Sequence, residues 1–207
     1  MNQIIKTNYE LLTMLHFDLN DNEVTRVRTI DDNICDKCSK FGYVWCLKYL
    51  HENGYQLGKW TCFDSARCGH LECLKYAHEN GCEWDEGTCY RTAQYGHLDC
   101  LKYAYENGCK LTDLTCRYAA AYGQLDCLKY LHENGCHWDK WTCQYATEKG
   151  HLECLKYAHE NGCPWTEETY LNAAMNGQLE CLKYAHENGC PWDGMNIHVV
   201  VRQAVET

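Results

Sequence analysis

The chain has 207 residues, 45% of them hydrophobic, and a formal net charge of −10. That length and apolar content suffice to bury a core, which excludes a disordered chain. No run of Lys or Arg forms the basic stripe that nucleic-acid phosphates require, and no stretch approaches the roughly 18 apolar residues of a membrane span. We therefore expect neither a nucleic-acid partner nor a membrane partner.

The first 28 residues do not follow the period of the rest of the chain. A helical pattern runs over residues 4–17, so we expect residues 1–28 to form an N-terminal helical cap. The start, MNQIIKTNYELLTMLHF, has a single Lys and no small-residue cleavage site, so it is not a secretory signal. We expect an intracellular, cytoplasmic protein whose 18 cysteines are thiols or metal ligands rather than disulfides.

Residues 29–193 are organised by a repeat. The word CLKY occurs six times, with 27 residues between successive copies, and ENG keeps the same step. A fixed period of about 20 to 50 residues marks a stacked array in which each unit buries its apolar face against its neighbours. We therefore expect six repeats of 27 residues over this range.

Two helices are expected in each repeat. The first begins at a Thr suited to N-capping and ends at a Gly. The expected caps are Thr61, Thr88, Thr115, Thr142 and Thr169, and the expected ends are Gly69, Gly96, Gly123, Gly150 and Gly177. The second helix runs over residues 71–80 in the clearest copy, and Gly81 takes the left-handed position that ends it.

The second helix is amphipathic. Cys73, Leu74 and Ala77 share one face, which predicts the core, and the opposite face carries Glu72 and Lys75 at a pairing distance in sequence. The loop that follows carries a large apolar residue in every copy, and such a column predicts packing between repeats. Its members are Trp84, Trp138, Trp165 and Trp192, with Leu57 and Leu111 in the other two copies.

The last residues, 194–207, read as a first helix without a second, so we expect a C-terminal capping helix there. The predicted fold is an all-α solenoid of about six short helix-loop-helix repeats, with capping helices at both ends.

The segment TCYRTA followed by GHLDCLKYAYENGC, residues 96–109, resembles the ankyrin repeat, whose units read TPLHLAA and then GHLEVVKLLLEKGA. The resemblance covers residues 30–207 and departs in length, since an ankyrin unit has about 33 residues. The missing residues fall before Thr115, so the long β-hairpin finger of ankyrin units is not expected. The resemblance implies stacked helix pairs and a non-enzymatic scaffold that binds another protein.

Two further resemblances concern source and docking. Short Cys-rich units with CLKYAHENGCPW are similar to ankyrin-type families of giant viruses that infect amoebae, which implies a viral chain acting on host proteins in the host cytoplasm or the virion. The segment ELLTMLHFDLNDNEVTRVR resembles the first half of an F-box, a motif that docks ubiquitin-ligase adaptors. The alternative for this segment is a plain capping helix.

Three cysteines recur in each repeat: one after the Thr, one in CLKY and one after ENG. With the His before ENG they match the ligand count of a structural zinc site. Cys73 and His78 point to different sides of one helix, however, and Tyr55, Tyr105 and Tyr170 replace ligands in single copies. We expect the thiols to be core residues and expect no cofactor. The alternative is a zinc site formed by His78, Cys82, Cys89 and a ligand from the next repeat.

No enzyme signature is present: the sequence lacks GxSxG, GxxxxGK[ST] and HExxH. We therefore expect no enzymatic activity and no catalytic residue. The alternative to a protein-binding scaffold is a structural or assembly component, virion-associated or oligomeric, and the oligomeric state is left open.

Positions of the first helix that vary between copies are candidates for recognition. They are rich in Tyr and Arg, residue types that are over-represented in protein interface hot spots. The predicted binding residues are Phe63, Asp64, Arg67, Tyr90, Arg91, Gln94, Arg117, Tyr118, Tyr122, Gln144, Tyr145, Glu148 and Lys149.

Overall fold

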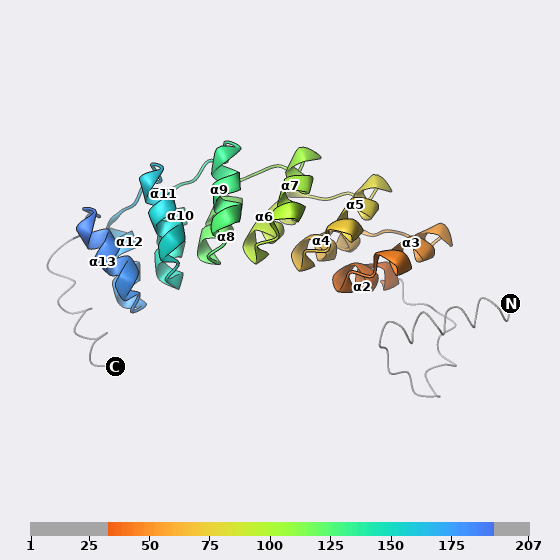
Figure 1. The fold of residues 1–207 in the computed structure, drawn as a ribbon, viewed down its shortest axis with the longest axis horizontal. Helices are drawn as coiled ribbons and strands as arrows, with labels where there is room; N and C mark the ends of the chain where they lie inside the picture. Colours follow the sequence, from red (N-terminus) through yellow and green to blue (C-terminus); the bar gives the residue numbers. More distant parts are fainter. Residues whose placement is uncertain (1–32, 193–207) are drawn as a thin grey trace, which may run out of the picture. The chain divides into compact units, whose positions relative to one another are not determined.

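The computed structural model of the chain describes residues 33–192, which contain twelve α-helices and no β-strand (Figure 1). The predicted caps, residues 1–28 and 194–207, lie outside the described residues. The all-α fold class is confirmed for the described part. None of its helices is long and apolar enough to cross a membrane.

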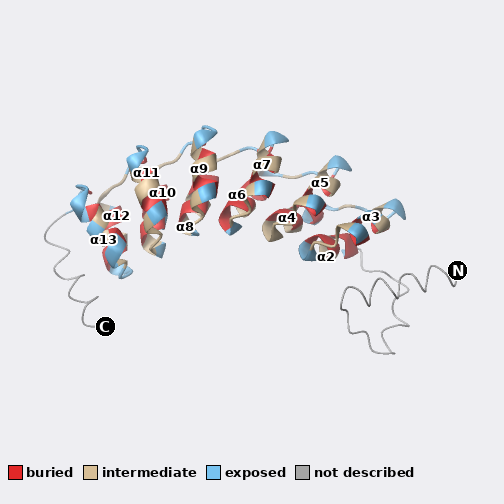
Figure 2. Ribbon diagram, viewed as in Figure 1, coloured by how far each residue is buried: buried red, intermediate tan, exposed pale blue. Residues whose placement is uncertain are grey.

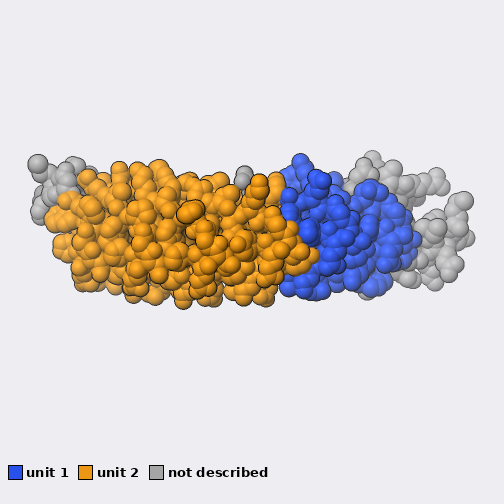
Figure 3. All heavy atoms as spheres, turned by 90° about the horizontal axis from the view of Figure 1, so that it is seen from above, with its two compact units in different colours: residues 1–84 blue, residues 85–207 orange. Residues whose placement is uncertain are grey.

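The described residues fall into two compact units, divided between Trp84 and Asp85 (Figure 3). Unit 1 contains two helix pairs, α2 (Ile34–Phe41) with α3 (Val44–Glu52) and α4 (Lys59–Cys68) with α5 (Leu71–Glu79). Unit 2 contains four helix pairs, α6 (Glu86–Tyr95) with α7 (Leu98–Glu106), α8 (Asp113–Ala121) with α9 (Leu125–Glu133), α10 (Lys140–Lys149) with α11 (Leu152–Glu160), and α12 (Glu167–Met175) with α13 (Leu179–Glu187). We call the even-numbered helices first helices and the odd-numbered ones second helices.

Within each unit the helix pairs are stacked. In unit 2 each first helix packs on the next first helix, and each second helix packs on the next second helix (Figure 1). In unit 1, α2 packs on α4 and α3 on α5. The first helices contact one another more extensively than the second helices do. This is the solenoid arrangement that the 27-residue period predicts.

The second helices bury the face that the sequence predicts. In α5, Cys73, Leu74 and Ala77 are all buried. The leucine of CLKY is fully buried in five successive copies, Leu47, Leu74, Leu101, Leu128 and Leu155. Burial of one leucine side chain contributes about 1.5–3 kcal/mol, so these leucines are large apolar anchors among smaller Cys and Ala residues. In α3 and α9 a second leucine, Leu50 or Leu131, is buried as well.

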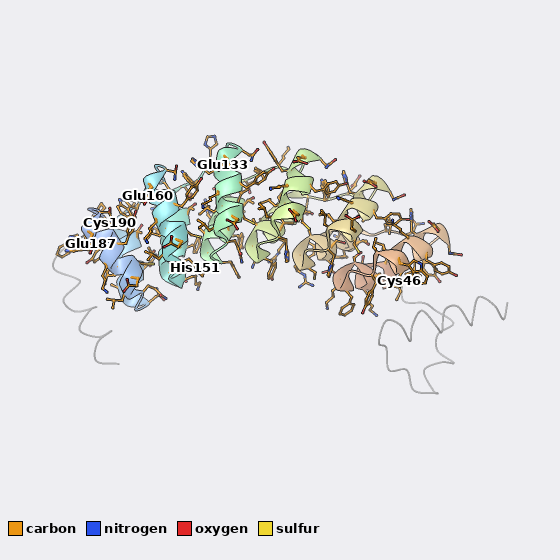
Figure 4. All side chains as sticks on the ribbon, in the orientation of Figure 1. Cys46, Glu133, His151, Glu160, Glu187 and Cys190 are labelled. Carbon is orange, nitrogen blue, oxygen red and sulfur yellow. The ribbon has the colours of Figure 1, made fainter. Side chains whose placement is uncertain are left out.

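The opposite face of the second helices is charged and meets solvent. Lys75 pairs with Glu72 at 3.1 Å, as predicted, and the same i,i+3 pair recurs in α11 and α13. The ENG segments lie at the exposed C-terminal ends of these helices, where Glu133, Glu160 and Glu187 end α9, α11 and α13 (Figures 2 and 4). Exposed ion pairs of this kind contribute little to stability, so the charges solvate the helix.

The first helices α4 to α12 begin two residues before the predicted threonines, so each N-cap residue lies three residues before its threonine. Their N-cap residues are Gly58, Asp85, Thr112, Asp139 and Thr166. The predicted threonines are buried at position N3, and in α4, α8 and α12 their hydroxyl oxygen accepts a hydrogen bond from the N-cap backbone N–H at 3.1 to 3.3 Å. The predicted N-cap role of these threonines is therefore wrong. In α4, α8 and α12 the threonine therefore has the role of the N3 residue of a capping box, whose side chain accepts the N-cap backbone N–H.

The predicted glycine ends are confirmed for α4, α6 and α10, whose C-cap residues are Gly69, Gly96 and Gly150, whereas in α8 and α12 the glycine follows the C-cap residue. One of these glycines shows why glycine is needed. Gly150 follows α10 with φ +77°, and a Cβ there would lie 2.2 Å from Oε1 of Gln178 in the next repeat. The Gln178 amide in turn donates to the carbonyl of Glu148 at 3.5 Å. Glycine thus adopts the left-handed backbone and leaves room for a side chain that ties two repeats together.

Two residues of the tryptophan column, Trp138 and Trp165, pack between repeats in unit 2, as predicted. Trp138 meets Tyr157 of the next repeat edge-on, with ring centroids 6.1 Å apart. His132 stacks on Trp138 at 4.1 Å and hydrogen-bonds the Tyr157 hydroxyl through Nδ1 at 3.2 Å. The same arrangement of His, Trp and Tyr recurs around Trp165. The histidine before ENG is therefore a packing residue in these copies.

The cysteines fill the core as free thiols. All 18 lie among the described residues, and 17 of them are buried. The thiol after ENG donates to the carbonyl oxygen of the first-helix N-cap residue in its own helix pair, for example Cys136 to Thr112 at 3.2 Å. In residues 33–192 no three His, Cys, Asp or Glu side chains form a group that could hold a metal ion. His78, a ligand in the zinc alternative, stacks on Trp84 at 3.6 Å.

Candidate functional site

A hollow of about 300 Å³ lies between the first helices α8 and α10 of unit 2. Its lining comes from one edge of each helix and the residue after α8. The lining residues are Leu114, Arg117, Tyr118, Ala121, Tyr122, Tyr145, Glu148 and Lys149. Six of these eight residues belong to the set that the sequence predicts for binding. We call this site the α8/α10 hollow.

Large apolar side chains stand exposed around the α8/α10 hollow. Leu114, Tyr122, Trp141 and Tyr145 keep between 38% and 48% of their surface in solvent. Trp141 lies beside Tyr145 on α10, with ring centroids 6.2 Å apart. Apolar side chains gathered at one place on a surface are typical of an interaction site, whereas single ones are not.

The tyrosines of α6 and α8 form a connected row. Tyr90 stacks on Tyr118 at 5.1 Å, and Tyr118 contacts Tyr122 at 6.3 Å. Tyr95 approaches Tyr122 at 6.4 Å. Each ring is held by a neighbour, so the row presents its edges in a fixed arrangement and loses little conformational entropy when another molecule binds.

Arg117 forms the inner wall of the α8/α10 hollow and is bound to its own protein. Its guanidinium donates to both carboxylate oxygens of Asp139, the N-cap residue of α10, at 3.2 and 2.7 Å. It also donates to Asp113 on α8. Arg117 therefore holds two first helices together and contributes to the hollow mainly as a positioning residue.

The rim of the α8/α10 hollow carries one exposed ion pair. Lys149 lies 2.8 Å from Glu148, and this hydrogen bond raises the pKa of the Lys149 ammonium. The two charges neutralise each other at the surface. The site is thus apolar and aromatic in its middle, with balanced charge at its edge.

Two predicted binding residues are not available at the surface. Gln94 is 4% exposed and accepts a hydrogen bond from Arg91 at 2.6 Å, and Gln144 is 2% exposed and donates to Thr166 of the next repeat at 3.1 Å. Both lie where first helices pack closely on one another, a contact that one repeat considered alone does not reveal. We therefore remove Gln94 and Gln144 from the candidate surface.

The remaining predicted residues lie on α4 and α6. In unit 1, Arg67 pairs with Asp64 at 3.0 Å, and Phe63 meets Trp60 edge-on at 5.2 Å. Asp64 and Trp60 also line a second hollow of about 350 Å³, together with Asn33, Asp36, Lys37 and Lys40. In unit 2, the guanidinium of Arg91 lies 4.9 Å from the centre of the Tyr90 ring.

Sequence reasoning missed Leu114 and Trp141, which stand directly before Thr115 and Thr142. With each Thr taken as the N-cap, these residues fall outside the helix and cannot share its edge. Once the Thr is placed at N3, both become second residues of the helix, beside the tyrosines four positions later. For α8 the buried Thr115 hydroxyl and its bond to the N-cap amide correct the register, and for α10 the burial of Thr142 and the cap made by Asp139 do so.

Comparison with known proteins agrees with this architecture. Residues 116–196 match the family model of ankyrin repeats in three copies. The fold is similar to that of the crystal structure of the human ASB11 ankyrin repeat domain, with a TM-score of 0.67 and 15% sequence identity over 82% of this chain and 96% of that domain. A search of curated proteins gave no match. Residues 116–196 thus match ankyrin repeats, and the fold of the described residues is similar to that of an ankyrin repeat domain, in agreement with the resemblance in sequence.

Proposed function

We propose that this chain is a non-enzymatic protein-binding scaffold and that its partner docks over the α8/α10 hollow. Ankyrin repeats imply a scaffold for protein–protein interaction. The choice of surface rests on one observation: exposed aromatic side chains surround the hollow, where two first helices are stacked side by side. These side chains are Tyr122, Trp141 and Tyr145.

The aromatic rings around the α8/α10 hollow suit a docking surface. Tyr and Trp rings bury large apolar area with few rotatable bonds, and interfaces place them in their centres. Here the rings surround a concave site of about 300 Å³ that can receive an apolar side chain of a partner. The ion pairs of Arg117 and Lys149 stand at its wall and rim, where they can select orientation without being buried unpaired.

The cellular context belongs to the same proposal. An intracellular, cytoplasmic site of action rests on the cysteine-rich composition of the sequence, which suits a reducing compartment. A viral origin and host proteins as partners rest on sequence similarity alone.

Affinity capture with matched baits tests the docking surface. The full chain, the double variant Tyr122→Ala/Tyr145→Ala and the control Trp45→Ala would each be immobilised and exposed to the same cell extract under reducing conditions. Trp45 is 57% exposed on the second helix α3, so its variant removes a comparable ring from another surface. We expect a protein retained by the unaltered chain and by Trp45→Ala to be lost from the double variant. Equal retention by all three baits would refute the assignment of the surface, provided circular dichroism shows equal helix content.

A further inference from the structure

Two thiols face each other inside one repeat of unit 2. Cys116 lies on α8, and Cys136 follows α9 in the same helix pair. Their sulfur atoms are 3.0 Å apart, and the thiol of Cys116 donates toward the sulfur of Cys136. A disulfide needs sulfurs about 2.05 Å apart, so the two atoms are within about 1 Å of bonding distance.

The two cysteines differ in a way that assigns them roles. Cys116 is fully buried, whereas Cys136 keeps 7% of its surface in solvent. The hydrogen bond from Cys116 lowers the pKa of the Cys136 thiol, while that contact and burial together raise the pKa of Cys116. The thiolate is the form of cysteine that reacts with oxidants, so Cys136 is the attacking sulfur and Cys116 the resolving one.

We propose that Cys116 and Cys136 are an oxidation site and form an intramolecular disulfide when the protein meets hydrogen peroxide. The Cys136 thiolate attacks one peroxide oxygen; the O–O bond breaks, a sulfenic acid forms, and hydroxide leaves and takes up the thiol proton as water. The sulfur of Cys116 then attacks the Cys136 sulfur, the S–O bond breaks, and a second water leaves. In total, two thiols lose two electrons and two protons, and peroxide is reduced to two waters. A thiol reductant reverses the bond.

The cross-link would join two parts of the candidate surface. Cys116 precedes Arg117, and the segment that carries Cys136 leads to Asp139, the carboxylate that Arg117 holds. Oxidation removes the hydrogen bond from the Cys136 thiol to Thr112 and replaces it with a covalent link to α8. The proposal does not depend on protein binding, because it concerns only the fate of the two thiols.

Another repeat supplies an internal control. In the α12/α13 pair, Tyr170 occupies the position of the first cysteine, and Cys190 packs against it. Cys190 is 1% exposed and donates to the Thr166 carbonyl at 3.4 Å, as Cys136 does to Thr112. It shares the surroundings of Cys136 but has an aromatic ring in place of the facing thiol, so it should stay reduced.

Peptide mapping of the full chain tests the proposal. The reduced protein would be treated with hydrogen peroxide in native buffer until the half-buried Cys68 is oxidised, then alkylated in denaturant and digested with trypsin. Residues 111–117 and 130–140 form separate tryptic peptides that each contain only one of the two cysteines. We expect most of both peptides to be joined, with the loss of two hydrogen atoms and recovery on reduction, while Cys190 is alkylated.

Two outcomes would overturn the inference. One is full alkylation of Cys116 and Cys136 after Cys68 has been oxidised, and the other is sulfinic acid at Cys136 with no cross-link. The variants Cys136→Ser and Cys116→Ser should each abolish the joined peptide. If the remaining cysteine of either variant formed a disulfide with another cysteine, oxidation would follow unfolding and the proposed pair would not be a native oxidation site.

Discussion

Arg117 on α8 and Asp139 at the start of α10 form a two-pronged ion pair across adjacent repeats, with nitrogen–oxygen distances of 3.2 and 2.7 Å. Asp139 also caps α10, because its Oδ1 accepts the amide of Trp141 at 3.1 Å. One carboxylate therefore fixes both the start of α10 and its distance from α8. That relationship sets the width of the α8/α10 hollow.

This double role predicts a graded loss of stability. Asp139→Asn keeps the cap and weakens the ion pair, so we expect a loss of about 1 kcal/mol for a partly exposed pair. Asp139→Ala loses both and should cost about 2 kcal/mol. Arg117→Ala also loses the pair with Asp113, so it should cost at least as much as Asp139→Asn. Urea unfolding followed by circular dichroism measures the three values. Equal losses for Asn and Ala at position 139 would contradict the capping role.

The contact between Gly150 and Gln178 predicts that two glycine-to-alanine variants lose different amounts of stability. Gly150→Ala and Gly162→Ala both place alanine at positive φ, a strain of about 1–2 kcal/mol. At Gly162 nothing lies within 4 Å of the new methyl group, whereas at Gly150 it displaces the Gln178 amide. The loss of that amide's hydrogen bond should add about 1 kcal/mol to the Gly150 variant.

A double-variant cycle isolates the contribution of the Gln178 hydrogen bond to the stability loss. In a Gln178→Ala background, Gly150→Ala should cost no more than Gly162→Ala does. An excess that persists without the glutamine would assign the effect to backbone strain at Gly150 itself. Thermal denaturation of the four proteins of the cycle and of Gly162→Ala is sufficient to compare them.

The period and the second helix could be predicted from the sequence because their signals are local. CLKY and ENG fix the buried Leu74 and the left-handed Gly81 within one repeat. The start of the first helix could not be read in the same way. A Thr at N-cap and a Thr at N3 give the same sequence motif, and only burial and hydrogen bonding separate them.

The candidate surface was predictable in part for a related reason. Tyr118, Tyr122 and Tyr145 were found because variation between copies singles out one helix edge. Gln144 lies on the same helices but meets the next repeat, and Arg117 is held by a carboxylate 22 residues further along the chain. Such contacts depend on the spacing of stacked helices, which a single repeat does not encode.

The buried thiols predict an alkaline limit to stability. Burial, with smaller effects of neighbouring charges, raises the pKa of Cys73 to about 11 and of Cys127 to about 12, above the value of about 8.5 in an unfolded chain. Because the folded state holds the proton more tightly, its advantage is complete below pH 8.5 and is lost as the pH rises toward the folded pKa. Each such thiol should lower the free energy of unfolding by up to about 1.4 kcal/mol per pH unit in that window.

Urea midpoints measured in reductant from pH 7 to pH 9.5 test this expectation. The midpoint should be nearly level up to about pH 8 and then fall steeply. The midpoint of Cys127→Ala should fall less steeply with pH, because this variant has one buried thiol fewer to titrate. A level midpoint over the whole range would mean that the cysteines are not buried as thiols.

The most direct test of the account is hydroxyl-radical footprinting of the chain, free and bound to a partner recovered by capture. If the partner covers the α8/α10 hollow, oxidation of Tyr122, Trp141 and Tyr145 should fall severalfold in the complex while that of Trp45 is unchanged. Protection of Trp45 with continued oxidation of those three rings would contradict it and place the binding surface elsewhere on the chain.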